Sequence, residues 1–427
     1  MNEYDSDVVA QHLRKEGYLP AASELEADLV LINTCTVRAR AEQKAFSFLG
    51  RMIKQKKKSP NLKVGIMGCV AQQYGSKLFS RFPELDLVLG TRELTRIRDH
   101  LSPSVAWSRV SATELDLQPP VAPLEPGYFR GRVTAFISIM EGCNNFCTYC
   151  VVPHTRGREA SRSPDEIEEE ARYLVSEGVK EITLLGQNVN SYSYREEGNG
   201  FPSLLDRLSR LPGLLRIRFT TSHPKDLSRE LIRCFRELPN LCRHIHLPFQ
   251  SGSTRILKRM HRGYSREQYL DRVEELRQAV PDIAITSDVM VGFPGETEED
   301  FEETLDLIRK IEFDNLYSFK YSDRLGTAAS RMRGKVADLE KGRRLETLQA
   351  LQKSITMRKN SGLVGSEQAV LVEDYSKKGN LLSGRSDGNK VVNFSGNNRC
   401  IGNIIKVFIE SSTAISLSGV HMESGNV

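Results

Sequence analysis

Short apolar runs alternate with amphipathic helical patterns along residues 1–104. Three of the runs have the length of a strand, namely ADLVLINTC (27–35), LKVGIMGC (62–69) and LDLVLG (85–90). Apolar strands separated by helices are typical of a parallel sheet, in which both faces are buried and each crossover needs a helix. The pattern predicts a small N-terminal α/β domain at residues 1–104.

Residues 105–130 show neither the hydrophobic period of a strand nor that of a helix, and they contain the proline-rich stretches QPPVAP and EPG. Proline removes a backbone donor and restricts the residue before it, so it interrupts helices and strands. We predict that residues 105–130 form a linker.

A longer alternation of strand and helix patterns fills residues 131–359. Its six strand-like runs are AFISIMEG, EITLLGQN, LRIRFTTS, HIHLPFQS, ITSDVMVGF and NLYSFKYS. Helical patterns between them open with capping residues, such as Ser163 with Glu166, Ser265 with Gln268, and Thr297 before an acidic turn. Six β/α units are fewer than the eight of a closed TIM barrel, which predicts a partial, open (β/α)6 barrel.

Residues 360–424 consist of β-branched runs separated by Gly, Ser, Asn and Asp, among them QAVLVEDYS and IGNIIKVFIE. This pattern predicts a small all-β module, an OB-like barrel. Its basic and acidic residues balance, so we predict no basic face for it.

The composition is that of a soluble globular protein, with 39% hydrophobic and 27% charged residues. No apolar run approaches the roughly 20 residues that a membrane span needs. The start, MNEYDSDVVA, lacks the apolar core of a signal peptide. We therefore expect a cytoplasmic protein without a membrane partner.

Two stretches are locally basic although the net charge is only +5. Residues 331–359 contain nine Lys or Arg against three Asp or Glu, and residues 51–60 contain five Lys or Arg and no acidic residue. Such stretches fit a polyanion partner such as RNA, or simply a solvated helix face. The sequence leaves both interpretations open.

Three of the eight cysteines fall within eight residues, as Cys143, Cys147 and Cys150, in a C-x3-C-x2-C pattern after the first of the six strands. A zinc site closes with four ligands, and an iron–sulfur cluster is normally held by four thiolates. Three thiolates predict a [4Fe–4S] cluster with one iron left open to a chelating cofactor.

Cys35 and Cys69 stand at the carboxyl ends of two predicted parallel strands. Ligands gather at this edge of a parallel sheet, so both are candidates for a functional site. Cys234, Cys242 and Cys400 have no such placement, and we predict that they are core residues.

The cysteine spacing resembles the radical S-adenosylmethionine (SAM) superfamily, whose motif also has an aromatic residue before the third cysteine, here Tyr149. The resemblance implies that Cys143, Cys147 and Cys150 hold the cluster and that SAM chelates its open iron. One-electron reduction would then cleave SAM to a 5′-deoxyadenosyl radical. The resemblance to this superfamily implies no side chain that acts as a general acid or base.

Further motifs resemble the methylthiotransferases, namely CTYCVVPHTRG, LLGQNVNSY, HLPFQSGSTRILKRMHRGY, VGFPGETEEDF and FKYSDRLGTAA. GRSDGNKVVNF resembles their TRAM module, an RNA-binding barrel. The similarity covers essentially the whole chain, and it is greatest to the MiaB group, the tRNA-2-methylthio-N6-dimethylallyladenosine synthases. It implies addition of a methylthio group to C2 of N6-(dimethylallyl)adenosine next to the anticodon of tRNA. The implied partners are tRNA, an electron donor such as flavodoxin or ferredoxin, and a sulfur source, with a monomer expected.

The resemblance also implies a second, auxiliary [4Fe–4S] cluster, involved in sulfur donation and held by three cysteines of the N-terminal domain. Cys35 in INTCTVR and Cys69 in GIMGCVAQ match the second and third of these. The first belongs to a G-C-Q-M-N motif, and this chain begins at the methionine of that motif. Either the start is placed at an internal methionine or the auxiliary cluster is labile or absent.

Residues at the strand ends and beside the cluster motif are candidates for contact with SAM. They are Tyr149, Gln187, Asn188, Ser222, Gln250 and Gly292. For Gly292 we expect a backbone shape that lets the ligand approach. We predict structural roles for His154, His223, His244 and His246. Arg156 and Arg158 are predicted to meet RNA phosphate or the SAM carboxylate, or to lie on the surface.

Other functions remain open from the residues. The same chemistry acts in related enzymes on threonylcarbamoyl-adenosine of tRNA or on an aspartate of a ribosomal protein. A different class is a non-catalytic RNA-binding protein with a structural cluster. That function would not explain why three cysteines leave one iron of the cluster open. A simple electron carrier has no need of the C-terminal module or of six β/α units.

Overall fold

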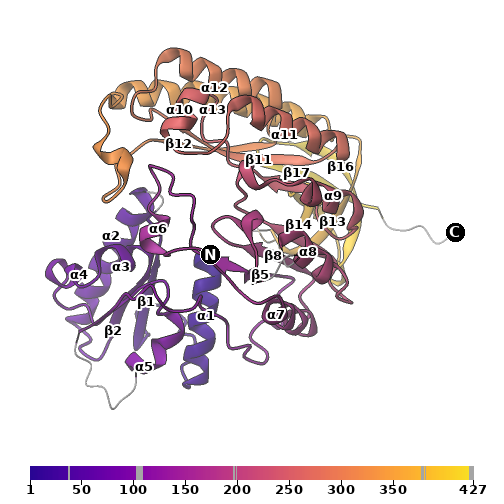
Figure 1. The fold of residues 1–427 in the computed structure, drawn as a ribbon. Coiled ribbons are helices and arrows are strands. Elements are labelled where there is room, and N and C mark those ends of the chain that lie inside the picture. The colour runs from indigo at the N-terminus through magenta and orange to yellow at the C-terminus, as the bar shows by residue number, and fades with distance from the viewer. Residues whose placement is uncertain are drawn as a thin grey trace. The chain divides into compact units, whose positions relative to one another are not determined.

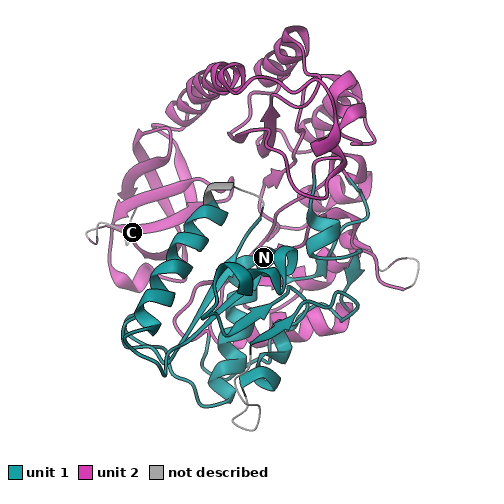
Figure 2. Ribbon diagram, turned by 90° about the vertical axis from the view of Figure 1, so that its left-hand side faces the viewer, with its two compact units in different colours: residues 1–128, 138–146, 150–162 teal, residues 129–137, 147–149, 163–427 magenta. Residues whose placement is uncertain are grey.

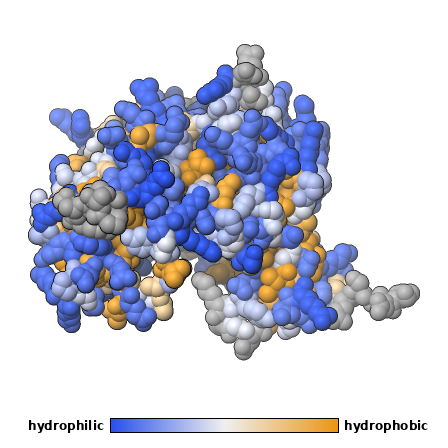
Figure 3. Space-filling model, turned by 90° about the horizontal axis from the view of Figure 1, so that it is seen from below, coloured by the Kyte–Doolittle hydropathy of each residue, from blue (hydrophilic) through white to orange (hydrophobic). Residues whose placement is uncertain are grey.

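The computed structural model describes residues 1–36, 39–101, 109–195, 198, 200–376, 379 and 381–422. The chain divides into two compact units (Figure 2). Unit 1 comprises residues 1–128, 138–146 and 150–162, and unit 2 comprises residues 129–137, 147–149 and 163–427. The face drawn in Figure 3 is mostly hydrophilic, with hydrophobic residues in scattered groups. None of the described helices has the length and apolarity to cross a membrane.

Unit 1 contains a parallel sheet in the order β1-β2-β3-β4. The strands are β1 (Leu29–Thr34), β2 (Lys63–Gly68), β3 (Leu87–Leu89) and β4 (Val110–Ala112). The helices are α1 (Asn2–Lys15), α2 (Ala39–Lys56), α3 (Cys69–Tyr74), α4 (Lys77–Arg81), α5 (Ile97–Leu101) and α6 (Val152–Thr155). Leu49 and Met52 of α2 pack against Val64 and Ile66 of β2, so the three predicted strands and their covering helices are confirmed.

The segment predicted as a linker is partly built into this sheet. Residues 102–108 lie outside the described residues, but β4 follows directly and pairs with β3. Further on, Ala122 is buried and the Tyr128 hydroxyl donates to Asp7 Oδ1 at 2.8 Å. The linker prediction was wrong here, because a three-residue edge strand has no period that a sequence pattern can show.

Six strands follow the predicted β/α alternation, in unit 2 apart from Ser138. They are β5 (Thr134–Ser138), β8 (Glu181–Leu185), β9 (Arg216–Phe219), β10 (His244–His246), β11 (Ala284–Val291) and β12 (Asn315–Lys320). They form two three-stranded sheets, β5-β8-β9 and β10-β11-β12. Ser222 N donates to His246 O at 3.3 Å and a parallel bridge joins Ile217 to Leu241, so β10 continues beside β9. The partial (β/α)6 arrangement is confirmed (Figure 1).

The helices of this part are α7 (Pro164–Ser176), α8 (Phe201–Ser209), α9 (Arg229–Glu237), α10 (Thr254–Arg259), α11 (Arg266–Ala279), α12 (Glu298–Ile311) and α13 (Asp338–Ser361). Three of them, α7, α11 and α12, begin directly after the predicted capping residues Ser163, Ser265 and Thr297. Capping boxes form at Ser265 with Gln268 and at Thr297 with Asp300. Ser163 caps α7 by accepting from Asp165 N, so a side chain–backbone bond replaces the predicted box with Glu166.

The C-terminal strands, coloured yellow in Figure 1, close into a barrel in the order β13-β14-β15-β17-β16. They are β13 (Glu367–Tyr375), β14 (Leu382–Ser386), β15 (Val391–Ser395), β16 (Ile404–Ser412) and β17 (Ser416–His421). Val370, Val392, Val407 and Leu417 fill its interior. The predicted all-β barrel is confirmed, and the last two residues of its predicted range, 423 and 424, lie outside the described residues.

The C-terminal barrel packs on the amino ends of the strands of unit 2. Arg216, the first residue of β9, donates from Nη1 to Arg385 O at 2.6 Å. Asp314, which precedes β12, accepts from Lys390 Nζ at 3.0 Å. These contacts occupy the amino edge, so the carboxyl ends of β8, β9, β10 and β11 are left for a ligand.

Candidate functional site

Cys35 directly follows β1, and Cys69 directly follows β2. These strands are neighbours, and Thr34 at the end of β1 pairs with Gly68 at the end of β2. Cys69 is buried at the start of α3. Burial raises the pKa of the Cys69 thiol, Arg156 opposes that rise, and the nearby charges of Asp5 and Cys35 add to it. The two predicted auxiliary-cluster cysteines are therefore close enough to interact electrostatically.

Arg156 is the centre of a buried ion-pair network in unit 1. Its guanidinium contacts Asp5 Oδ2 at 2.5 Å and Glu141 Oε1 at 2.6 Å. Arg92 Nε lies 2.9 Å from the other oxygen of Glu141. The predictions for Arg156 were therefore wrong, because two buried carboxylates already bind the guanidinium that was expected at RNA, at SAM or on the surface. Arg158 is exposed.

The cysteine loop is divided, with Cys143 and Cys150 in unit 1 and Cys147 in unit 2. Cys143 N donates to Gly157 O at 3.3 Å, and Val152 N donates to Cys150 Sγ at 3.5 Å. Within the described ranges, no three side chains of His, Cys, Asp or Glu are grouped so that they could hold a metal ion. The three-thiolate site stays a prediction from the spacing.

Cys147 is buried, and the Arg262 guanidinium lies against it. Arg262 Nη1 is 3.4 Å from Cys147 Sγ, while Nη2 donates to Pro248 O at 2.9 Å and Nε donates to Tyr264 Oη at 3.3 Å. Sequence reasoning missed this residue, since nothing in the motif HRGY points to a cysteine so far along the chain.

Three buried polar atoms without a hydrogen-bond partner gather after β8 and β9. They are Asn188 Oδ1, Ser222 Oγ and His223 Nε2. The loops that carry them are tied together, because Asn190 Nδ2 donates to His223 O at 2.9 Å. Buried polar groups are nearly always satisfied, so three orphaned atoms at one edge indicate a polar ligand. The amino, carboxylate and hydroxyl groups of SAM are of the kind that would satisfy them.

The histidines differ in how well their rings are satisfied. His244 Nε2 and His246 Nδ1 each lie 3.0 Å from Thr286 Oγ1, as structural residues do. In His223, Lys225 N donates to Nδ1 at 3.3 Å, which leaves the hydrogen on Nε2 without an acceptor. Burial, followed by Arg262 and Lys225, lowers the pKa of His223 to about 2. His223 is thus a neutral donor shortly after a strand end, which makes it a candidate for ligand contact in addition to its predicted structural role.

Strained backbone follows two of the strands of unit 2. Thr221, shortly after β9, and Gln250, shortly after β10, both have φ of +66°. Side chains other than glycine rarely occupy this region, and a β-branched threonine least of all. Such residues cluster at ligand sites, where the surrounding structure holds them in place.

The remaining candidates are placed as follows. Gln250 is buried and donates from its backbone N to Asp288 O at 2.9 Å, and Gln187 is half-buried two residues after the end of β8. The Tyr149 ring meets Phe293 edge-on, with centroids 6.5 Å apart. Gly292 has φ of +73°, which confirms a special backbone shape, but a Cβ there would lie 2.3 Å from Lys341 Cγ. The glycine thus makes room for the Lys341 side chain rather than for a ligand.

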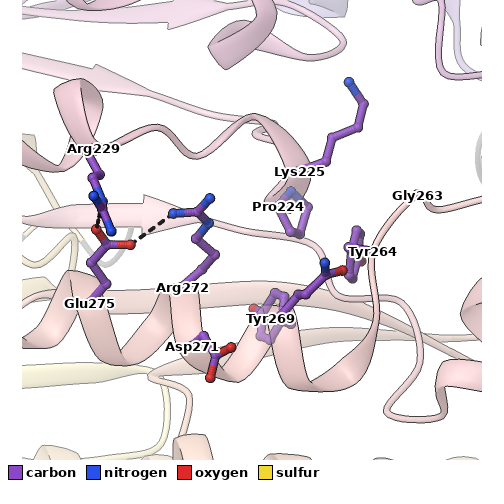
Figure 4. Close-up of a pocket in the computed structure, with 10 residues that line it drawn as sticks. Pro224, Lys225, Arg229, Gly263, Tyr264, Tyr269, Asp271, Arg272 and Glu275 are labelled. Atoms are coloured by element: carbon purple, nitrogen blue, oxygen red, sulfur yellow. Dashed lines mark hydrogen bonds and ion pairs between the residues drawn. The ribbon is translucent and has the colours of Figure 1, made fainter.

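A pocket of about 360 Å³ lies beside Tyr264 (Figure 4). Glu275 accepts from Arg229 Nε at 2.8 Å and from Arg272 Nη1 at 2.9 Å, so these charges satisfy one another. None of the three orphaned atoms belongs to a residue that lines this pocket. It is therefore distinct from the polar edge formed by Asn188, Ser222 and His223.

The basic stretch at residues 331–359 is largely neutralised by ion pairs. The pairs are Lys335–Asp323, Lys341–Asp338, Arg343–Glu298, Arg344–Glu296, Arg358–Glu312 and Lys359–Asp314. In the second stretch, Lys56 pairs with Asp86 and Lys57 with Glu84. The first stretch is therefore mainly ion-paired and gives little support to a polyanion site. In the second stretch the ion pairs involve two of the five basic residues, so it stays compatible with either interpretation.

Comparison with known proteins gives three matching family models. The Radical SAM superfamily matches residues 137–308, the Uncharacterized protein family UPF0004 matches residues 1–90, and the TRAM domain matches residues 363–420. Among solved structures, the radical S-adenosylmethionine methyltransferase TsrM from Kitasatospora setae aligns with a TM-score of 0.56 at 17% identity. The alignment covers 77% of this chain and 74% of TsrM, and at this identity it supports the fold alone.

Two relatives carry the name tRNA-2-methylthio-N(6)-dimethylallyladenosine synthase. The protein of Syntrophus aciditrophicus is 49% identical over 98% of this chain and 92% of its own length. That of Geobacter metallireducens is 49% identical over 98% of this chain and 95% of its own length. With this identity along nearly the whole chain and the three matches in order, the chain belongs to the radical SAM family of tRNA-2-methylthio-N(6)-dimethylallyladenosine synthases.

Proposed function

We propose that this chain is a tRNA methylthiotransferase that adds a methylthio group to C2 of N6-(dimethylallyl)adenosine next to the anticodon. The observation that carries the proposal is the 49% identity, over 98% of the chain, to relatives named for this product. The TRAM match at residues 363–420 supports an RNA partner, because the C-terminal barrel it covers belongs to an RNA-binding type.

Within this proposal, Cys143, Cys147 and Cys150 hold the SAM-binding [4Fe–4S] cluster, and Cys35 and Cys69 contribute to the auxiliary cluster. When bound, the clusters and SAM supply the radical and sulfur chemistry that protein side chains lack. The donor set fits, since thiolates are the usual ligands of iron–sulfur clusters.

The chain itself binds and orients the cofactor at the carboxyl ends of its strands. When SAM is bound, Asn188 Oδ1 would accept from one of its donors, and Ser222 Oγ and His223 Nε2 would bind its oxygen atoms, which would satisfy the three orphaned groups. Further contacts with SAM are proposed for Tyr149, Gln187 and Gln250, whereas Gly292 makes room for the Lys341 side chain. An adenine edge reaches this site only when the base is splayed out of its stack.

The proposal requires tRNA, a low-potential one-electron donor of the flavodoxin or ferredoxin type, and a sulfur source. A monomer suffices, because all of the candidate residues are on one chain. The location we propose is the cytoplasm, where tRNA is modified.

The test is an anaerobic assay of the reconstituted protein with tRNA that carries N6-(dimethylallyl)adenosine, read by mass spectrometry of the nucleosides. We expect the 2-methylthio product, with none from Cys147→Ala and an undiminished yield from Cys234→Ala, a cysteine outside the site. If the methylthio group is instead added to threonylcarbamoyl-adenosine or to a ribosomal-protein aspartate, the proposed substrate is wrong and that molecule takes its place. Absence of SAM cleavage on reduction would favour a non-catalytic RNA-binding protein.

A further inference from the structure

The buried cation of Arg262 has no anionic partner among the described residues. Arg262 is only 6% exposed, and its guanidinium donates to Cys147 Sγ, Pro248 O and Tyr264 Oη. Two of these acceptors are neutral at every ordinary pH, and the third is a sulfur. A buried charge without a counter-charge is costly, so such an arrangement persists where an anion completes it.

Other buried arginines show what is missing. Arg156 is paired with Asp5 and Glu141, Arg218 Nε lies 2.9 Å from Glu181 Oε1, and Arg344 Nη1 lies 2.7 Å from Glu296 Oε1. Arg216 resembles Arg262 in having backbone carbonyls as acceptors, but its role is visible, since those carbonyls belong to the C-terminal barrel. Arg262 instead faces a predicted cluster ligand.

The contact is fixed by the backbone on both sides. Thr148 N, next to Cys147, donates to Met260 O at 3.0 Å, and Thr148 Oγ1 donates to Arg259 O at 3.0 Å. His261 has the left-handed φ of +59° and turns the chain between these bonds and Arg262. The guanidinium is therefore held against the sulfur by the loop that carries it.

We propose that Arg262 is a positioning residue that sets the reduction potential of the SAM-binding cluster through a hydrogen bond to Cys147 Sγ. This inference rests on the proposed function, because it takes Cys147 as a thiolate ligand of that cluster. The anionic cluster supplies the counter-charge that the buried guanidinium lacks.

Reduction adds one electron from a flavodoxin- or ferredoxin-type donor, with no proton taken up and no bond made or broken at Cys147. The cluster and its thiolates become more negative by one charge. A fixed cation at the ligand sulfur stabilises the more negative state, and hydrogen bonds to cluster sulfurs are known to tune the potential. Arg262 thus makes the cluster easier to reduce before SAM is cleaved.

The test is an EPR-monitored redox titration of the reconstituted protein, following the signal that changes when SAM is added. For Arg262→Gln we expect the ratio of reduced to oxidised cluster at a fixed potential to fall about tenfold, equal to a shift of about 59 mV for a one-electron couple. Arg262→Lys keeps the charge and is expected to shift less. Arg216→Gln, which removes a buried arginine that donates only to carbonyls, is the matched control and leaves the potential unchanged. An unchanged or more positive potential in Arg262→Gln overturns the inference.

A second measurement covers the case in which Arg262→Gln does not fold. Protein labelled with ¹⁵N in the arginine guanidinium is reduced and examined by pulsed EPR for ¹⁵N coupled to the SAM-responsive cluster. We expect coupling in the unsubstituted chain and in Arg216→Lys, and its loss in Arg262→Lys. A SAM-responsive cluster without this coupling overturns the role of Arg262 and leaves the proposed function standing. A SAM-responsive signal that persists in Cys147→Ala overturns the ligand assignment itself.

Discussion

His223 and Ser222 stand side by side at the end of β9, and each has a buried polar atom without a partner. The backbone N–H of Lys225 fixes the tautomer of His223, and the lowered pKa keeps its ring neutral at physiological pH. A neutral N–H donor binds a carboxylate or hydroxyl oxygen without exchanging a proton with it. At the residue scale, the candidate site is a set of buried polar atoms that lack hydrogen-bond partners.

Replacing His223 by Leu removes one such donor and is expected to weaken SAM binding. A hydrogen bond contributes about 0.5–1.5 kcal/mol net, so the dissociation constant should rise roughly 2- to 13-fold. Equilibrium dialysis of SAM against the reconstituted protein measures this. His421→Leu, in a strand of the C-terminal barrel, is the control, and equal affinities for both variants would show that His223 does not contact SAM.

Some of these residues could be found from the sequence and others could not. Asn188 and Ser222 could be proposed from the sequence, because they follow strands whose ends the apolar runs already mark. Arg262 was not found, because its contact with Cys147 spans 115 positions and exists only once the barrel is folded. Arg156 was misjudged for the same reason, since its partner Asp5 is 151 positions away.

Elements follow their periodicity where both faces are buried or where a capping residue is present. The six barrel strands and the capping boxes of α11 and α12 were predicted for this reason. β4 was missed, because its three residues are half-buried or exposed at the edge of the sheet and only their pairing with β3 makes them a strand. No local sequence pattern predicts that the C-terminal barrel packs on the amino ends of β9 and β12.

Asp314, which precedes β12, connects three elements of unit 2 where the C-terminal barrel packs on the amino ends of the strands. Its carboxylate accepts from Lys359 Nζ of α13 at 2.7 Å and from Lys390 Nζ of the β14–β15 turn at 3.0 Å. Burial acts to raise the pKa of Asp314, but Lys390 and Lys359 outweigh it, and the pKa is lowered. Because the folded-state pKa is depressed, Asp314 stabilises the fold fully above the unfolded-state pKa of about 3.9, and this contribution is lost as the pH falls through the folded-state value.

Asp314→Asn is therefore expected to lower the free energy of unfolding at neutral pH by roughly 1.5–3 kcal/mol, the net contribution of hydrogen bonds to a charged group. The difference from the unsubstituted chain should shrink as the pH falls below about 4, where Asp314 itself becomes neutral. Urea unfolding at a series of pH values measures both effects. Asp271→Asn, an exposed carboxylate of α11, serves as the control. A difference that stays constant with pH would mean that the charge of Asp314 is not what holds the elements together.

Across the whole molecule, cofactor binding and folding are linked. Ligands that bind only the folded state stabilise it in proportion to the logarithm of their concentration over the dissociation constant. The orphaned atoms of unit 2 and the uncompensated Arg262 mean that the protein without its cluster retains unsatisfied groups.

We expect the anaerobically reconstituted protein to unfold at a higher temperature than the protein without clusters, with a further rise on adding SAM. Calorimetry under anaerobic conditions gives both unfolding temperatures. The triple variant Cys143→Ala/Cys147→Ala/Cys150→Ala should lose the rise with SAM, whereas Cys242→Ala, a core cysteine, should keep it although its absolute stability falls. A SAM-dependent rise in the triple variant would contradict the cluster assignment.

The sequence by itself determined what depends on neighbours along the chain. The spacing of Cys143, Cys147 and Cys150, the periods of the strands and helices, and the placement of Cys35 and Cys69 after strands are all local properties. Tertiary structure alone decided which charged and polar groups meet: Arg156 with Asp5 and Glu141, Arg262 with Cys147, and Asp314 with Lys390. The physical reason is that backbone conformation and burial follow from short-range pattern, whereas the partner of a buried charge is chosen by packing between segments far apart in the chain.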